Sequence, residues 1–416
     1  MGLGVVEIYI YMKRFWLILL WVPWMWGLTS AHAETPFQQA LASALASHPS
    51  VLGRQADIRA AHADLEGANW ARYPVPSVEA TTPAAGDGMP GGLLRIDQPL
   101  WAGGRISGSI DNAQRQVDVS GNALVETRWT VALQVISAYF EALRQGAREA
   151  HAKAAIAEHE KLLAMIQRRV VQEVSPPVDQ RFAESRLFQA QSDKSQATQS
   201  LNNAIAQLAQ LTGQTGSEIS WDGLDTQGVP ASLEAAKQAA IGASPTLRRL
   251  RNEAAIAEAT IDIRRSAYKP QVLLRLERQA GGSLVADSRA MIVLQAQPGA
   301  GLAAFTAVDS AVAKRDSALM AIETAKSDLN TRVSVDWDDY VASTSRLSDS
   351  RVSSAMSAEI FDSYARQYVI GRKTWIDVLN AVRESVQANY LLEDARAQSV
   401  AAAMRLRLSC GMLLPE

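Results

Sequence analysis

The sequence repeats its own landmarks in its two halves, and this duplication restricts the possible folds more than any other feature. Prolines, a Gln-Pro motif, aspartates and glycines recur in the same order, shifted by 196 to 199 positions. The pairs are Pro49 with Pro245, Pro74 with Pro270, "DQPLWAGG" (97–104) with "AQPGAGLA" (296–303), Asp179 with Asp377, and Gly213 with Gly411. One match arises readily by chance, whereas several matches in order indicate two copies of one structural plan.

This duplication predicts the domain organisation. Residues 34–213 are expected to form the first repeat, residues 214–232 a linker, and residues 233–416 the second repeat. Each repeat is predicted to contain a helix of roughly 35 residues, a short β-hairpin and a long helical hairpin. The β-hairpins are expected at 75–101 and 270–298, and the helical hairpins are expected to turn near 173–179 and 371–377.

The helices of the helical hairpins are predicted to be unusually long. Residues 104–173 contain no proline, and 70 residues of helix would extend roughly 105 Å, too far for the core of one globular domain. Pro176 and Pro177 then force the chain to turn. Small and apolar residues alternate at spacings of four and three, which predicts a coiled-coil seam. The seam residues are Ile136, Phe140, Leu143, Ala147, Ala150, Ala154 and Ala157.

The predicted strands alternate between apolar and charged residues. In "LLRIDQPLW" (93–101), Leu94 and Ile96 fall on one face and Arg95 and Asp97 on the other. Such strands suit either amphipathic hairpins on a soluble core or transmembrane strands with their apolar side toward lipid. Four strands cannot close a barrel, and open edges are not tolerated in hydrocarbon, so the second interpretation requires several subunits. Three copies would supply twelve strands.

Residues 1–33 have the three parts of a secretory signal peptide. Two basic residues precede an apolar core at 15–28, and "AHA" (31–33) provides a small-residue cleavage site. A retained transmembrane anchor is the alternative, but the apolar run is short and Pro23 interrupts it. Met12 is an alternative start. The pattern predicts export from the cytoplasm.

The composition and the residue spacing predict neither an enzyme nor a cofactor-binding protein. The net charge of −2 gives no reason to expect nucleic acid as a partner, and Cys410, the single cysteine, excludes an intrachain disulfide. No group of residues has the spacing of a metal site or of a catalytic site, so we expect no catalytic residue and no metal. The histidines beyond residue 33 are His48, His62, His151 and His159.

Two motifs resemble the TolC family of outer-membrane channel-tunnels: "QPLWAGGR" (98–105) and "YVIGRKTWIDVLNA" (368–381). The resemblance extends over essentially all of the chain beyond residue 33. It implies a mainly α fold with a small membrane β part, in which a trimer forms a twelve-stranded outer-membrane β-barrel above a long periplasmic α-barrel. Family members work with a periplasmic adaptor (membrane fusion) protein and an inner-membrane ABC transporter or drug pump.

The resemblance also implies a periplasmic gate at the helical turns. Tyr368 and Gly371 fit the Tyr-x-x-Gly that precedes the second turn, and Asp377 fits the acidic residue that lines the closed entrance. Asn380 stands where well-known members carry a second acidic residue, so each subunit would contribute one carboxylate to this ring. The alternative role for Asp377 is that of an acid at a helix N-terminus, interacting with the helix dipole.

The first turn departs from this pattern. Glu173 replaces the glycine, although Asp179 still matches the acidic position. In the family, a basic residue after the second glycine pairs with that acid across subunits, and either Arg372 or Lys373 would serve. The resemblance further implies a hydrogen bond from Tyr368 to the same carboxylate.

The segment "GRKTWIDVLNAVRE" (371–384) is most similar to the branch of the family that serves type I secretion of large surface adhesins. Partners in drug or small-molecule efflux remain the main alternative. A soluble periplasmic coiled-coil adaptor is the alternative from another class, because such proteins also use long helical hairpins.

Overall fold

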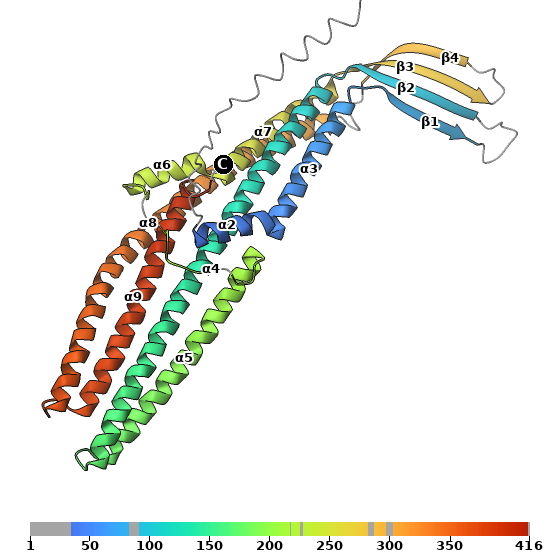
Figure 1. Ribbon diagram of the computed structural model, residues 1–416. Coiled ribbons are helices and arrows are strands. Elements are labelled where there is room, and N and C mark those ends of the chain that lie inside the picture. Colours follow the sequence, from blue (N-terminus) through green and yellow to red (C-terminus); the bar gives the residue numbers. More distant parts are fainter. Residues whose placement is uncertain are drawn as a thin grey trace, which may run out of the picture. The chain divides into compact units, whose positions relative to one another are not determined.

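The computed structural model describes residues 35–82, 91–216, 218–224, 228–281, 287–296 and 303–414 (Figure 1). The predicted signal peptide (1–33), most of the two β-hairpin loops (83–90 and 282–286) and nearly all of the "AQPGAGLA" motif lie outside the described residues. Residues Pro36–Glu416 form one unit, which is the subject of the following paragraphs.

The predicted fold class, mainly helical with four strands, is confirmed. The first half contains α2 (Pro36–Ser47), α3 (Pro49–Trp70), β1 (Val75–Thr81), β2 (Gly91–Trp101), α4 (Arg105–Val171) and α5 (Pro177–Thr212). The second half contains α6 (Leu233–Ala243), α7 (Pro245–Arg265), the 3₁₀ turn η1 (Ser266–Tyr268), β3 (Gln271–Gly281), β4 (Asp287–Gln295), α8 (Ala303–Val369) and α9 (Trp375–Ser409). Helices α4 and α8 each have 67 residues.

The expected helix of roughly 35 residues before each β-hairpin is wrong, because both copies divide it into two helices. A residue before proline is driven out of the helical conformation. His48 is accordingly extended (φ −64°, ψ 128°), and Pro49 starts α3. Ser244 is likewise non-helical (φ −57°, ψ 114°) before Pro245, which starts α7. The Ser244 side chain accepts a hydrogen bond from the backbone N–H of Leu247. The repeated prolines therefore mark helix starts.

Helix α4 lies at the centre of the packing. It contacts α3, α5, α7 and α9, while α8 pairs with α9 and with α7. Near its middle, Val135, Ile136 and Tyr139 are completely buried. The Tyr139 hydroxyl donates to the backbone carbonyl of Ser220 at 2.9 Å, so the segment between the two halves is attached to the core. Burying each such side chain contributes about 1.5–3 kcal/mol.

The predicted coiled-coil seam on α4 is correct only for its first part. Ile136, Phe140 and Leu143 are buried, but Ala150, Ala154 and Ala157 are exposed. The face of α4 that is buried in the second half of the helix runs instead through Ala152, Ala155, His159, Leu162 and Ile166. Alanine is common on both faces of this helix, so its spacing alone did not identify which face packs.

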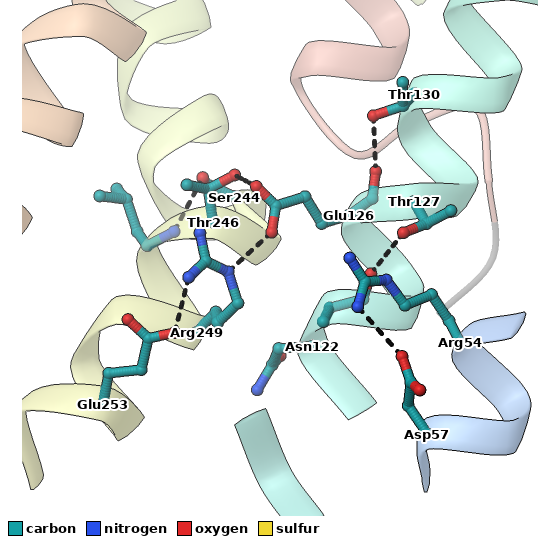
Figure 2. A network of polar contacts seen from close by, with 12 residues as sticks. Arg54, Asp57, Asn122, Glu126, Thr127, Thr130, Ser244, Thr246, Arg249 and Glu253 are labelled. Atoms are coloured by element: carbon teal, nitrogen blue, oxygen red, sulfur yellow. Dashed lines mark hydrogen bonds and ion pairs between the residues drawn. The ribbon is translucent and has the colours of Figure 1, made fainter. Parts of the chain in front are cut away.

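A polar network joins α4 to α7 (Figure 2). Arg249 on α7 donates through Nε to Glu126 on α4 at 2.8 Å and through a terminal nitrogen to Glu253 at 2.6 Å. The Thr246 hydroxyl donates to the other oxygen of Glu126 at 2.9 Å. This carboxylate thus receives two hydrogen bonds from α7, and the neighbouring ion pair of Arg54 and Asp57 on α3 lines the same polar cavity.

The four strands form one antiparallel sheet in the order β1-β2-β3-β4, in which the central β2–β3 pair joins the two halves of the chain. Arg95 is paired with Glu277 at 2.9 Å, and Arg275 with Asp97 at 2.7 Å, on one face. The other face is apolar and largely exposed. Its residues include Val78, Leu94, Leu276, Ile292 and Leu294.

The "QPLWAGGR" motif forms the connection from β2 to α4. Gly103 has a left-handed backbone (φ 61°), and a Cβ atom added there would lie 2.8 Å from the Cβ of Lys269. The connection therefore requires glycine both for its backbone conformation and for its close contact with the segment that precedes β3.

Candidate functional site at the helical turns

The second helical turn has a glycine bend followed by a capped helix. Gly371 is left-handed (φ 76°), which ends α8. Thr374 is the N-cap of α9. Its hydroxyl accepts from the backbone N–H of Asp377, while the Asp377 carboxylate accepts from the backbone N–H of Thr374 at 3.0 Å and from its hydroxyl at 2.8 Å. The two residues form a reciprocal capping box.

These hydrogen bonds determine the electrostatics of Asp377. The backbone N–H and then the hydroxyl of Thr374 lower the pKa of the Asp377 carboxyl below its ordinary value, and the charge of Lys373 adds to the effect. Asp377 is therefore ionised near neutral pH. Within the chain it has the role of a helix N-terminal acid, which was the alternative weighed from the sequence.

The first helical turn is built differently. Glu173 occupies the position equivalent to Gly371 and adopts the same left-handed conformation (φ 57°). Pro176, the N-cap of α5, provides no side-chain cap. Asp179 is the third residue of α5, as Asp377 is of α9, but burial raises the pKa of its carboxyl above the ordinary value. Two equivalent aspartates thus have pKa values shifted in opposite directions.

Tyr368 connects the two turns. Its side chain is only 6% exposed and packs beside the Trp375 ring, with the centroids 5.2 Å apart. The guanidinium of Arg169 lies over the Tyr368 ring at 4.9 Å, and the hydroxyl is 3.4 Å from Ser175 Oγ. Among the described residues, the Tyr368 hydroxyl therefore contacts Ser175 of the first turn and not the Asp179 carboxylate, to which the resemblance implied a hydrogen bond.

Trp375 and Arg169 were not predicted as site residues. The indole Nε1 of Trp375 donates to the backbone carbonyl of Asp179 at 3.1 Å. The tryptophan also belongs to a buried cluster that includes Ile166, Ala183 and Val378. Trp375 lies between Gly371 and Asp377, inside the motif quoted above. A large aromatic ring in an otherwise polar turn indicates packing against a neighbouring segment, so this position could have identified Trp375 from the sequence.

The remaining predicted residues lie around the second turn. Lys373 places its ammonium group 4.0 Å from the centre of the Tyr364 ring, which is a cation–π contact. Arg372 is exposed at the bend itself. Asn380 is partly exposed one turn after Asp377 on α9. The structure thus brings Tyr368, Gly371 and the polar residues of this segment to one end of the helical hairpins, next to Asp179.

A group of ion pairs around Asp394 joins the two helical hairpins. Arg148 on α4 donates to both oxygens of Asp394 on α9, and Arg144 lies 3.5 Å from the same carboxylate. The two arginines come from the first half of the chain and the aspartate from the second, so no local pattern in the sequence indicated the contact. Most of the contact between the two hairpins is made by α4 and α9.

Within the described ranges, none of the helices combines the length and the apolar run that crossing a lipid bilayer requires.

Comparison with known proteins finds a family match over part of the chain. Residues 40–214 match the model of the outer membrane efflux protein family. No curated protein sequence matches the chain at a significant level.

Several solved structures share the fold along nearly the whole chain. A structure of CusC has a TM-score of 0.80 at 15% identity and covers 91% of this chain and 92% of its own. The outer membrane protein VceC of Vibrio cholerae has a TM-score of 0.77 at 16% identity, and the match covers 90% of this chain and 96% of VceC. The open state of the MtrE outer membrane channel of Neisseria gonorrhoeae has a TM-score of 0.76 at 17% identity, covering 91% and 89%.

The family match and the fold agree with the resemblance found in the sequence motifs and with the expected outer-membrane localisation. They do not favour the soluble adaptor. Residues 40–214 are thus similar to the outer membrane efflux protein family, and the chain has the fold of the outer-membrane channels CusC, VceC and MtrE.

Proposed function

We propose that this chain is the subunit of a trimeric outer-membrane exit duct, which receives its cargo from an inner-membrane pump through a periplasmic adaptor protein. The observation that carries this proposal is the two-faced sheet. One face presents exposed apolar side chains, with Val78 79%, Ile292 72% and Leu294 70% exposed, while the other carries the Arg–carboxylate pairs. This is the arrangement of a wall between lipid and water.

The sheet also supports assembly from several subunits. Its outer strands, β1 and β4, each pair with one neighbour within the chain and so have one unpaired edge. Unpaired backbone groups are too costly in hydrocarbon, so the strands of several subunits must close one barrel. Three copies of this sheet would supply twelve strands.

The turns at the ends of the helical hairpins are the proposed periplasmic gate. Asp377 and Asp179 would supply carboxylates to the closed entrance, with Tyr368, Gly371 and Asn380 shaping the turn. For the basic partner across subunits, Arg372 suits the role better than Lys373. Arg372 is exposed, whereas the ammonium of Lys373 already lies on Tyr364 within the chain.

The second candidate is more specific: an exit duct for type I secretion of a large adhesin, with an ABC transporter as the pump. The segment 371–384 carries this candidate, through its similarity to that branch of the family. Efflux of drugs or other small molecules competes with it, and the matching family is named for efflux. Deletion of the gene separates the two: loss of one large surface protein supports secretion, and increased drug sensitivity with an unchanged surface supports efflux.

Membrane fractionation and crosslinking test the duct itself. We expect the protein in the outer membrane, soluble only in detergent, and crosslinked as a trimer. A soluble monomer in the periplasm would refute the proposal.

Single-channel conductance tests the gate. Substitution of Asp377 by alanine would break the capping box as well as remove the charge. Asp377→Asn with Asp179→Asn removes both charges while retaining acceptor oxygens, and this double variant should open more often. Asp349→Asn, at an exposed position on α8, is the matched control. If the double variant behaves like the control, these aspartates do not hold the gate.

A further inference from the structure

A small cavity, partly open to solvent and lined by apolar as well as polar side chains, lies where α4, α5 and α9 meet, away from the helical turns. Its volume is about 130 Å³, several times the 10–15 Å³ that one water molecule requires. His159 of α4, Arg186 and Asp193 of α5, and Arg383 and Tyr390 of α9 contribute to its wall. The cavity therefore adjoins both helical hairpins.

His159 has a polar atom that lacks a partner at this cavity. Its side chain is only 7% exposed, and its Nδ1 atom is buried without a hydrogen bond to any described residue. Buried polar atoms in folded proteins nearly always have a partner, so an unpaired one calls for an explanation. Burial, followed by the charge of Arg186, lowers the pKa of His159, so the ring is neutral near pH 7 and carries one N–H.

The charges around the cavity are unbalanced. Arg186 is partly buried and Arg383 is exposed, and in the part of the chain that the structure describes neither forms an ion pair or a side-chain hydrogen bond. Asp193 is the acidic residue in the wall, and it accepts a hydrogen bond from Gln189 at 2.8 Å. Two guanidinium groups against one carboxylate leave a net positive charge beside a neutral imidazole that is able to donate.

We propose that this cavity binds one tetrahedral oxyanion, of the size and charge of sulfate or phosphate. The guanidinium groups of Arg186 and Arg383 supply charged, paired donors, which suit such ions. His159 contributes an imidazole to the same wall. The space accommodates the ion together with a few waters.

The position of the cavity gives the ion a structural consequence. Arg186 belongs to the first hairpin and Arg383 to the second, so a bound oxyanion links α5 to α9, two helices with few direct contacts. It would hold the hairpins together and oppose their separation. This consequence for opening rests on the proposed function, whereas the binding itself does not.

Equilibrium dialysis with radiolabelled sulfate tests the binding on the full-length protein in detergent. We expect one sulfate per chain, with affinity reduced on the order of tenfold or more in Arg186→Gln and in Arg383→Gln. Arg181→Gln removes the same charge from an exposed position of α5 outside the cavity and should bind like the original protein. Absence of binding, including the case in which a neighbouring subunit's carboxylate fills the cavity, would overturn the proposal, as would equal loss in Arg181→Gln.

A second measurement does not depend on channel activity. Sulfate next to His159 favours the protonated ring, so saturating sulfate should raise the pKa of His159, as followed by NMR on histidine-labelled protein. The signal is assigned by its absence in His159→Gln, and the increase should vanish in Arg186→Gln. Size-exclusion chromatography confirms that each variant keeps its assembly. An unchanged His159 titration in the presence of bound sulfate would place the ion elsewhere.

Discussion

The indole Nε1 of Trp375 donates a hydrogen bond to the backbone carbonyl of Asp179 at 3.1 Å, across 196 residues of sequence. The donor lies at the first residue of α9 and the acceptor in the first turn of α5, so this bond ties one helical turn to the other. The Tyr368 ring lies beside the indole and reaches the first turn through Ser175. The two turns of one chain therefore move together unless these contacts break.

Trp375→Phe keeps an aromatic ring but removes the hydrogen bond to Asp179. We expect a loss of about 1 kcal/mol in stability and a higher open probability in planar bilayers, because the two turns separate more easily. Trp337→Phe, on α8 and outside this cluster, should leave the open probability unchanged. Equal open probabilities for the two variants would show that the bond does not restrain the turns.

The backbone at the two turns predicts opposite effects of glycine. Glu173 is held in the left-handed region, which is unfavourable for any residue with a Cβ atom. Glu173→Gly should therefore raise the free energy of unfolding by up to about 1 kcal/mol. Gly371→Ala should lower the free energy of unfolding by about 1 kcal/mol, because alanine disfavours the left-handed backbone. No steric clash adds to this cost, since no atom lies within 4 Å of the added Cβ.

Thermal denaturation followed by circular dichroism measures both changes. Gly121→Ala, within α4 and also free of close contacts, is the control and should be stabilising by about 1 kcal/mol. If Gly371→Ala is as stabilising as this control, the turn does not need its left-handed residue.

The opposite pKa shifts of the two aspartates predict opposite pH dependence. The folded pKa of Asp377 lies below the ordinary 3.8, so its contribution to stability is present above that value and is lost as the pH falls through the folded pKa. The folded pKa of Asp179 is raised by burial, so its charge costs stability near neutral pH, and acid relieves that cost.

Melting temperatures between about pH 7 and pH 3 test this prediction. Near neutral pH, Asp179→Asn should raise the melting temperature and Asp377→Asn should lower it. Both differences should shrink in acid, that of Asp179→Asn first. Parallel curves for the two variants would contradict the assignment of different environments.

The Glu126 network predicts a contribution of the α4–α7 contact to stability. Glu126→Gln retains an acceptor for Thr246 but loses the ionic bond to Arg249, and we expect a cost of about 1–2 kcal/mol, measured by thermal denaturation. Glu258→Gln makes the same change at an exposed ion pair with Arg315 and should cost less. A larger loss in Glu258→Gln would be inconsistent with this ranking.

Local chemistry explains what the sequence was able to predict. Pro176, Gly371 and Thr374 act on the backbone next to them, and the alternation around Arg95 identifies the two faces of a strand, so the turns, caps and strands were visible. The buried face of α4 was not visible in the sequence, because alanine occurs on both the buried and the exposed face of this helix. The contacts of Tyr368 with Ser175 and of Arg148 with Asp394 were also missed, since they join residues 193 and 246 positions apart.

The unlike turns have a consequence for the stoichiometry of docking. In the proposed trimer, three proline turns with Pro176 and three glycine turns with Arg372 would alternate around the ring. A partner that recognises the basic side chain would bind as three copies, whereas one that fits only the common helical backbone would bind as six. Counting the partner molecules on one assembled duct therefore tells which of the two features is recognised.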